Sequence, residues 1–180
     1  MRAFLLAALI LPAFAAEPKE TPVSKPPLEF AGVARFPPLE GWRVRRTEGV
    51  DPSLAFLRGQ DGIRVKLFGG KGSRYLKLHD YLKGFEATTM GDPPERVREE
   101  TVSGLRVWFY RHGYPLTQGD PDVSDPRPPA LAAEEFCLLP VGGRFLVLSW
   151  SQESGAPDPE PGSAAAWRAF LDSFSLVKKK

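Results

Sequence analysis

The feature of this sequence that most constrains its fold is a set of three β-hairpin patterns. In each pattern, two runs of alternating apolar and polar residues are separated by a short turn that contains glycine. Alternation is typical of a half-buried strand, and a tight glycine turn leads the chain straight into an antiparallel neighbour. The paired runs are residues 54–59 with 63–68 around Gln60-Asp61-Gly62, 95–102 with 105–114, and 133–140 with 144–152. A mainly antiparallel sheet is therefore predicted.

The last of these runs, residues 144–152, is apolar on both of its faces. Phe145 and Val147 alternate with Leu146 and Leu148, so neither set of side chains is suited to contact with water. Such a strand is typical of the centre of a sheet that is covered on both sides. Shorter runs predict further strands at residues 33–36, 42–47 and, as an edge strand, 175–177.

Two segments have the helical period instead. Leu78, Leu82 and Phe85 predict an amphipathic helix over residues 77–88, with Met90 as a further member of its apolar stripe. The second stripe consists of Trp167, Phe170, Leu171 and Phe174, in a helix that Ser163 is predicted to cap. The elements together predict an α+β fold, an antiparallel sheet of about six to eight strands with two amphipathic helices packed on it.

The amino-terminal segment predicts export from the cytoplasm. One arginine precedes an apolar run over residues 3–11 that is too short to cross a bilayer as a helix. Ala13 and Ala15 are the small side chains that a signal peptidase requires, which favours cleavage before Ala16, and cleavage before Glu17 is the alternative. We therefore expect a periplasmic or secreted product.

The rest of the chain predicts one domain between two short tails. Residues 1–16 form the signal peptide, 17–28 a disordered leader rich in Pro, Lys and Glu, 29–177 a single α+β domain, and 178–180 a lysine tail. The formal net charge is only +2, which argues against a nucleic-acid partner. No later apolar run is long enough to span a membrane as a helix.

The single cysteine, Cys137, stands among Phe136, Leu138 and Leu139. It has no second cysteine with which to form an intrachain disulfide in an oxidising compartment. We expect a small buried apolar side chain rather than a reactive thiol.

This order of elements resembles the PsbP-like family over residues 30–177. The matching residues are Phe36-Pro37 and Gly41-Trp42, Ile63-Arg64-Val65, the helix over 78–85, Val102-Ser103-Gly104, a late strand that ends near Ser149, and the closing segment from Phe170 to Leu176. The resemblance implies one antiparallel sheet with packed helices. It also implies a non-enzymatic accessory or binding role, which members of the family have in photosystem II, in GTPase regulation or in the bacterial envelope. No binding residue of the family maps onto this sequence.

The proline-rich segment over residues 115–129 is predicted to be a long surface loop and contains the one candidate metal site. Asp120, Asp122, Ser124 and Asp125 supply the oxygen atoms that Ca²⁺ prefers. An EF-hand loop that begins at Asp120 would require glycine where Asp125 stands and glutamate where Leu131 stands. The site is therefore a weak candidate, and no cofactor is predicted.

The segment Gly69-Gly70-Lys71-Gly72-Ser73 could hold a phosphate through its backbone amides. It is not a P-loop, because glycine follows the lysine where serine or threonine is required and Val65 stands where the first glycine belongs. A flexible link between a strand and a helix is the better interpretation.

No catalytic residue is predicted. His79 and His112 belong to no metal-binding spacing, and the sequence has no nucleophile elbow. The carboxylate pairs Glu99-Glu100 and Glu134-Glu135 are adjacent on strands, so their members point to opposite faces and cannot act together.

The aromatic residues leave Trp42 and Tyr114, near turns, as the better candidates for a ligand-binding or partner-binding surface, while Trp108 and Trp167 are expected in the core. The sequence thus predicts an exported binding domain that acts on an envelope or secreted protein. An envelope hydrolase with an unrecognised site and a Ca²⁺-dependent binding module that uses Asp120, Asp122 and Asp125 are the alternatives.

Overall fold

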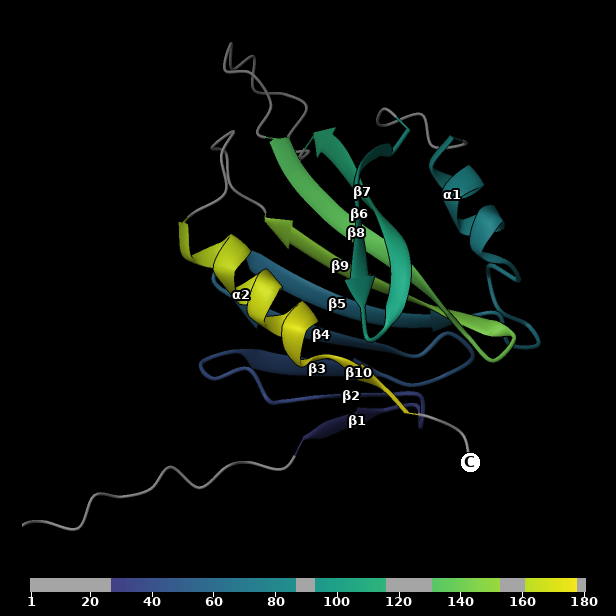
Figure 1. Ribbon diagram of the computed structural model, residues 1–180, viewed down its shortest axis with the longest axis horizontal. Helices are drawn as coiled ribbons and strands as arrows, with labels where there is room; N and C mark the ends of the chain where they lie inside the picture. The colour runs from purple at the N-terminus through teal and green to yellow at the C-terminus, as the bar shows by residue number, and fades with distance from the viewer. Residues whose placement is uncertain (1–26, 87–92, 116–130, 153–160, 178–180) are drawn as a thin grey trace, which may run out of the picture.

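The computed structural model describes residues 27–86, 93–115, 131–152 and 161–177 (Figure 1). These residues form an α+β fold with two helices and antiparallel strands, as the sequence predicts. The expected signal peptide and most of the expected leader lie outside the described residues, as do the lysine tail and Met90. No described helix is long and apolar enough to cross a membrane.

The main sheet contains seven strands in the order β3-β4-β5-β9-β8-β7-β6, and every neighbouring pair is antiparallel. Three of the contacts between neighbours are the predicted hairpins, β4 with β5, β6 with β7, and β8 with β9. The strands are β3 (Arg43–Thr47), β4 (Ser53–Arg58), β5 (Asp61–Phe68), β6 (Glu95–Val102), β7 (Leu105–Pro115), β8 (Leu131–Val141) and β9 (Arg144–Gln152).

The first hairpin turn differs from its prediction. Arg58 pairs with Asp61, so the turn is Gly59-Gln60, and Asp61 and Gly62 are already part of β5. The positive φ that a two-residue hairpin turn requires falls on Gly59, at 57°. The turn between β6 and β7 is Ser103-Gly104 as expected, with φ of 50° and 82°.

Strand β9 lies between β5 and β8, and residues 145–152 are all buried. Its even-numbered leucines contact the core on one face of the sheet, and Phe145 and Val147 contact a second core on the other. The prediction of a central strand covered on both sides is confirmed.

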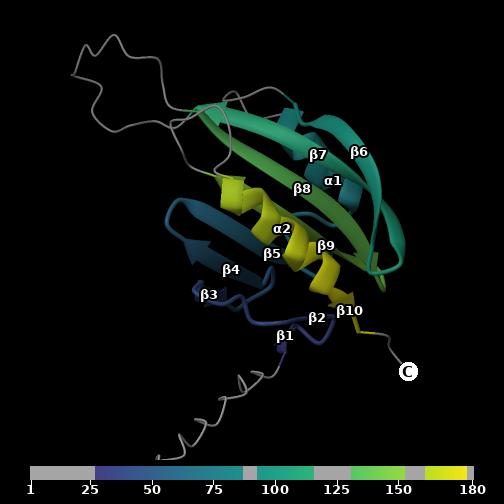
Figure 2. The same cartoon turned by 60° about the vertical axis from the view of Figure 1, so that its left-hand side comes forward.

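The two helices cover opposite faces of the main sheet (Figure 2). Helix α1 (Leu78–Glu86) packs Tyr81 against Phe136 and Phe145. Helix α2 (Pro161–Ser173) buries Trp167 and Phe170 in the larger core. It begins at Pro161 rather than after a Ser163 cap, because proline is favoured in the first helical turn, where its missing N–H leaves no bond unmade.

A small second sheet completes the larger core. It contains β1 (Leu28–Phe30), β2 (Ala34–Phe36) and β10 (Ser175–Leu176), in the order β1-β2-β10. The predicted last strand therefore pairs with β2 and is no edge strand of the main sheet. Phe36 anchors the small sheet, with its ring centroid 5.5 Å from that of Phe56 on β4 and 5.6 Å from that of Phe170 on α2.

Candidate functional site

Of the residues that the sequence singles out as binding candidates, Trp42 and Tyr114 belong to the described part of the chain. Asp120, Asp122, Ser124 and Asp125 lie outside the described residues. Tyr114 belongs to β7. Trp42 is half-buried against the larger core, and the Arg58 guanidinium lies 4.6 Å from the centre of its ring.

The tryptophan with the exposed ring is Trp108, contrary to expectation. It is 41% exposed on β7, and the Arg96 guanidinium lies 5.3 Å from its ring centre. Trp108 alternates with Val107 and Phe109, which point to the larger core, so it faces the other side of the sheet near its edge. Strand alternation, rather than aromatic character, decides which face of the sheet Trp108 occupies.

The two histidines are separate features of the fold. His79 lies exposed at the start of α1. His112 is buried on β7, paired across the sheet with Glu134, and its ring centroid is 4.9 Å from that of Phe85. Cys137 is fully buried, as expected, and burial raises the pKa of its thiol.

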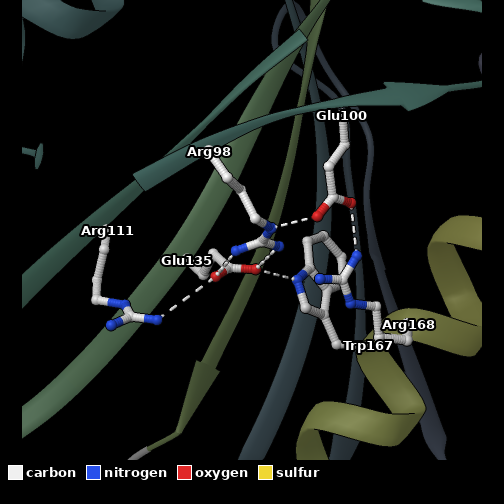
Figure 3. A network of polar contacts seen from close by, with 6 residues as sticks. All are labelled: Arg98, Glu100, Arg111, Glu135, Trp167 and Arg168. Carbon is white, nitrogen blue, oxygen red and sulfur yellow. Dashed lines mark hydrogen bonds and ion pairs between the residues drawn. The ribbon is translucent and has the colours of Figure 1, made fainter. Parts of the chain in front are cut away.

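A network of charged side chains joins α2 to strands β6 and β8 (Figure 3). Arg98 on β6 donates two hydrogen bonds to the carboxylate of Glu135 on β8, at 2.5 and 2.6 Å. The indole Nε1 of Trp167 on α2 donates to the same carboxylate at 2.8 Å. Glu135 is only 6% exposed, so this charge is held by a bidentate arginine and a buried N–H.

Glu100 extends the network to the exposed side of α2. Its carboxylate accepts hydrogen bonds from Arg98 Nε and from Arg168 Nη1 on α2. Arg111 on β7 lies 3.9 Å from Glu135 at the other end. The network therefore ties α2 to the β6–β8 part of the sheet by charged contacts as well as by apolar packing.

The acids of this network are held in their ionised form. Burial raises the pKa of Glu135, but the hydrogen bonds from Arg98 and Trp167 and the charges of Arg98 and Arg111 outweigh burial, and the pKa is lowered. The pKa of Glu100 is lowered chiefly by its hydrogen bond from Arg168, and the contact with Arg98 adds to this effect, so that together they outweigh burial, which raises the pKa. Both acids therefore act as fixed anions that hold the helix.

Sequence reasoning missed this network because it examined Glu134-Glu135 and Glu99-Glu100 only as carboxylate pairs. The signal was the strand alternation itself. Glu135 has the same parity as Cys137 and Leu139, which point to the larger core. An acid among inward-pointing residues of a covered strand needs a buried cation and hydrogen-bond donors.

A second polar cluster holds the first turn of α2. The Ser163 hydroxyl donates to Asp61 Oδ1 at 2.5 Å and accepts from the indole Nε1 of Trp150 at 2.9 Å. Arg58 lies 3.6 Å from the other oxygen of Asp61. Because the hydroxyl proton is committed to Asp61, we interpret Ser163 as a structural contact of the helix.

The feature of the structure best suited to bind a ligand is a pocket of about 370 Å³ between α1, the β4–β5 hairpin and the segment that leads from β5 into α1. We call it the α1 pocket. It is lined by Asp51, Ser53, Lys66, Phe68, Arg74, Tyr75, Tyr81, Gly84 and Phe85.

The rim of the α1 pocket is a turn that is held by hydrogen bonds. Asp51 accepts from the Ser73 hydroxyl at 2.6 Å and from the backbone N–H of Arg74 at 2.9 Å. The Gly69 N–H donates to Ser73 Oγ at 3.0 Å, and the Ser73 N–H donates to the Gly70 carbonyl at 2.9 Å. The glycine-rich segment is thus a defined turn that uses two of its amides internally, which weakens the phosphate interpretation.

The walls of the α1 pocket are aromatic. The Tyr75 ring centroid is 5.3 Å from that of Phe68 and 5.1 Å from that of Tyr81, and both pairs are edge-to-face. Tyr81 also contacts Phe85, at 5.5 Å between ring centroids. Burial, followed by the charge of Glu134, raises the pKa of Tyr81, so its phenol is neutral at physiological pH.

Two cations complete the lining. Within the parts of the chain that the structure describes, neither the Lys66 ammonium nor the Arg74 guanidinium forms an ion pair, and the Arg74 guanidinium lies 5.3 Å from the ring centre of Tyr75. The acid of the pocket, Asp51, is occupied by Ser73 and by the Arg74 backbone. The pocket therefore combines an apolar aromatic wall with positive charge that is available to an anion.

Fold and pocket together define the class of the described part of the chain as an α+β protein with a ligand-sized, aromatic-walled pocket beside α1. No protein-family model matches the chain, and no curated protein matches it.

Two of the solved structures that match part of this chain illustrate the similarity. A protein from Bacteroides thetaiotaomicron is 11% identical, with a TM-score of 0.48 over 81% of this chain. The chain spans 46% of the length of that protein. LpqN of Mycobacterium tuberculosis, described as involved in cell envelope biogenesis, is 11% identical, with a TM-score of 0.40 over 81% of this chain and 83% of its own.

Proposed function

We propose that this chain is an exported accessory protein of the cell envelope or the extracellular space, and that it binds its ligand in the α1 pocket. The aromatic wall with two cations, Lys66 and Arg74, that form no ion pair among the residues that the structure describes is the observation that carries the proposal. Export rests on the signal-peptide pattern of residues 1–16. Membership of the PsbP-like family is part of the same proposal, and it rests on the sequence resemblance over residues 30–177.

The chemistry of the pocket specifies the kind of ligand. A volume of about 370 Å³ is at the small end of ordinary ligand sites, so we expect a small molecule or a single side chain of a partner. The aromatic rings suit a flat or apolar body. Lys66 and Arg74 suit a carboxylate, sulfonate or phosphate group on that body, because a charge-assisted hydrogen bond to either cation would then form.

Removal of both cations is expected to weaken binding of an aromatic anion. Anilinonaphthalene sulfonate is a suitable probe, because its ring system and its sulfonate match the two parts of the pocket. In a fluorescence titration, the double variant Lys66→Gln, Arg74→Gln should bind this dye about tenfold more weakly than wild type, through loss of two charge-assisted contacts. A variant with Lys71→Gln and Lys83→Gln, two exposed lysines outside the pocket lining, loses the same charge and should bind as wild type does.

A neutral dye separates the two parts of the site. Phenylnaphthylamine has the aromatic body but lacks the sulfonate, so it should bind more weakly than anilinonaphthalene sulfonate. Its affinity should be the same for wild type and for the double variant Lys66→Gln, Arg74→Gln. The assigned role of Lys66 and Arg74 would be contradicted if their replacement lowered the affinity for both dyes equally. It would also be contradicted if the two double variants lost equal affinity for anilinonaphthalene sulfonate. Melting temperatures of all variants confirm that the dye reports the folded protein.

Gly84 gives a second test that changes only the shape of the pocket. A Cβ at this position would lie 2.9 Å from the Tyr75 hydroxyl oxygen, so Gly84→Ala should turn the Tyr75 ring aside. Alanine favours a helix over glycine by about 1 kcal/mol, so the melting temperature should hold or rise while dye affinity falls. Gly162→Ala in α2 is the matched control, because a Cβ there meets nothing within 4 Å. Unchanged dye binding by Gly84→Ala would place the ligand elsewhere.

A further inference from the structure

We propose that the outer edge of strand β3 pairs with an acidic, extended segment of a partner protein, which adds one strand to the main sheet. This interaction surface is separate from the α1 pocket and does not depend on it. Addition of a strand to an open sheet edge supplies affinity through backbone hydrogen bonds and specificity through the side chains that face each other across the strands.

The edge of β3 is regular and open. β3 is the last strand of the main sheet on its side and pairs with β4 in an unbroken register from Arg43–Leu57 to Thr47–Ser53. All five residues of β3 are exposed. Among the residues that the structure describes, no other strand pairs with β3, so one row of its backbone N–H and C=O groups faces outward.

The opposite edge of the same sheet, β6, is built differently. Its register with β7 shifts between Arg96 and Arg98, and such a bulge disrupts regular pairing. The three charges at the centre of β6 are also neutralised within the molecule. Glu99 pairs with Arg106, and the other two charged residues of its centre, Arg98 and Glu100, belong to the α2 network. The β6 edge is therefore irregular, with its central charges paired, whereas the β3 edge is regular and carries available positive charge.

The charge on β3 has one sign. Arg43 and Arg45 point to one face, and neither has an ion pair within the described parts of the chain. Arg46 points to the other face beside Val44, where its guanidinium donates a hydrogen bond to the Glu29 carbonyl at 3.1 Å and lies 3.8 Å from the Glu48 carboxylate. An acidic partner strand would thus place its carboxylates opposite cations whose charge is available.

A second copy of this chain is excluded as the occupant by the same arginines. An antiparallel pair of β3 strands centred on Arg45 places Arg45 opposite itself. A pair centred between Val44 and Arg45 places Arg43 opposite Arg46. Like charges directly opposite each other destabilise a strand pair, so the edge disfavours its own sequence and favours a complementary one.

The register specifies the partner segment. Read opposite Thr47, Arg46, Arg45, Val44 and Arg43 in turn, an antiparallel partner should present a polar, an acidic, an acidic, an apolar and an acidic residue. The peptide STEEVETS has this pattern, and STKKVKTS is its charge-reversed counterpart. Both peptides serve as probes, and the protein in each titration is the chain without its signal peptide.

Two N-methylated forms of STEEVETS test the backbone pairing. One form carries methyl groups on the odd-numbered amides and the other on the even-numbered amides, and the charge is unchanged in both. In an antiparallel pair only one of these two sets of N–H groups points toward β3. We expect STEEVETS to bind in a fluorescence anisotropy titration, one methylated form to bind about tenfold more weakly, and the other to bind as the parent does. Equal affinity of the two methylated forms would show a merely electrostatic attraction and would overturn strand addition.

The protein side of the contact is tested with the arginines. Arg43→Gln with Arg45→Gln should weaken STEEVETS binding by about tenfold, since two cross-strand ion pairs are lost. Lys71→Gln with Lys83→Gln, off the edge and of equal charge change, should leave it unchanged. Absence of binding up to about 1 mM peptide, or binding of STKKVKTS as tight as that of STEEVETS, overturns the proposal and assigns the arginines to the protection of an exposed edge alone.

Discussion

Replacement of Phe170 by alanine is expected to destabilise the folded protein by about 4 kcal/mol, which corresponds to a fall in melting temperature of about 10 °C. Phe170 on α2 is fully buried. Its ring contacts Phe36 of the small sheet, Phe56 of the main sheet, and Trp167 and Phe174. Loss of the ring removes apolar burial and leaves a cavity where three layers of the fold meet. Chemical denaturation followed by circular dichroism measures the effect.

Asp172→Ala is the matched control, because it lies on the exposed side of the same helix and should change stability by less than about 0.5 kcal/mol. If Phe170→Ala and Asp172→Ala lower the free energy of unfolding by the same amount, α2 does not pack on the sheet as described. Such a result would also contradict the contact between Phe36 of the small sheet and this ring of α2.

The second large effect is expected from Glu135→Gln. The substitution keeps the shape of the side chain and removes the charge that compensates Arg98. Removal of one partner of a buried ion pair leaves the other uncompensated, which costs a few kcal/mol. We expect about 2 kcal/mol at neutral pH, because Arg98 is 26% exposed and keeps its contact with Glu100. Glu134→Gln, on the opposite face of the same strand, is the control.

At acidic pH, the difference in the free energy of unfolding between Glu135→Gln and wild type should become smaller. The folded-state pKa of Glu135 lies below its ordinary value of 4.5, so its ionised form contributes full stability above that pH. The contribution is lost as the pH falls through the lowered pKa. The free energies of unfolding of the two proteins should therefore converge as the pH is lowered below 4.5 and through the lowered pKa of Glu135. A difference that stays constant on acidification would show that the charge of Glu135 is not what stabilises α2.

The two faces of the main sheet have different characters. On the face of α2, the Glu135 network, the Ser163 cluster and the aromatic core all act on one helix, so substitutions there should lower stability. On the face of α1, the packing is less complete and leaves the α1 pocket between Tyr81 and the turn around Ser73. Substitutions at Lys66, Arg74 or Gly84 should therefore change binding more than stability.

Local features of this fold could be predicted because the interactions that specify them lie within a few residues. The Ser103-Gly104 turn lies at the predicted place, since it requires positive φ at two adjacent positions and the strands beside it alternate clearly. The first turn differs, because the sequence predicts it at Gln60-Asp61-Gly62 and the structure forms it at Gly59-Gln60. Asp-Gly is the commoner turn signal, but Asp61 is buried beside Ser163, a contact between residues far apart in the chain.

The candidate sites depend on contacts between residues that are far apart in the sequence. Arg98 and Glu135 are separated by 37 positions, and Trp167 and Glu135 by 32. No local pattern specifies which buried cation meets which buried acid. The α1 pocket likewise combines a residue before β4 with the turn after β5 and with α1, and only the packing of Tyr81 against the sheet brings them together.

By itself, the sequence determined the α+β class, the three hairpins, the two amphipathic helices, the burial of Cys137 and the double burial of the last long strand. These follow from turn chemistry and from the periods of two and 3.6 residues, which are local. The tertiary structure alone decided that β5 pairs with β9, that β10 joins β2, that Trp108 is exposed, and that β3 is left as an open basic edge. The physical reason is that apolar faces attract one another without direction, so the choice among possible neighbours is made by the packing of the whole chain.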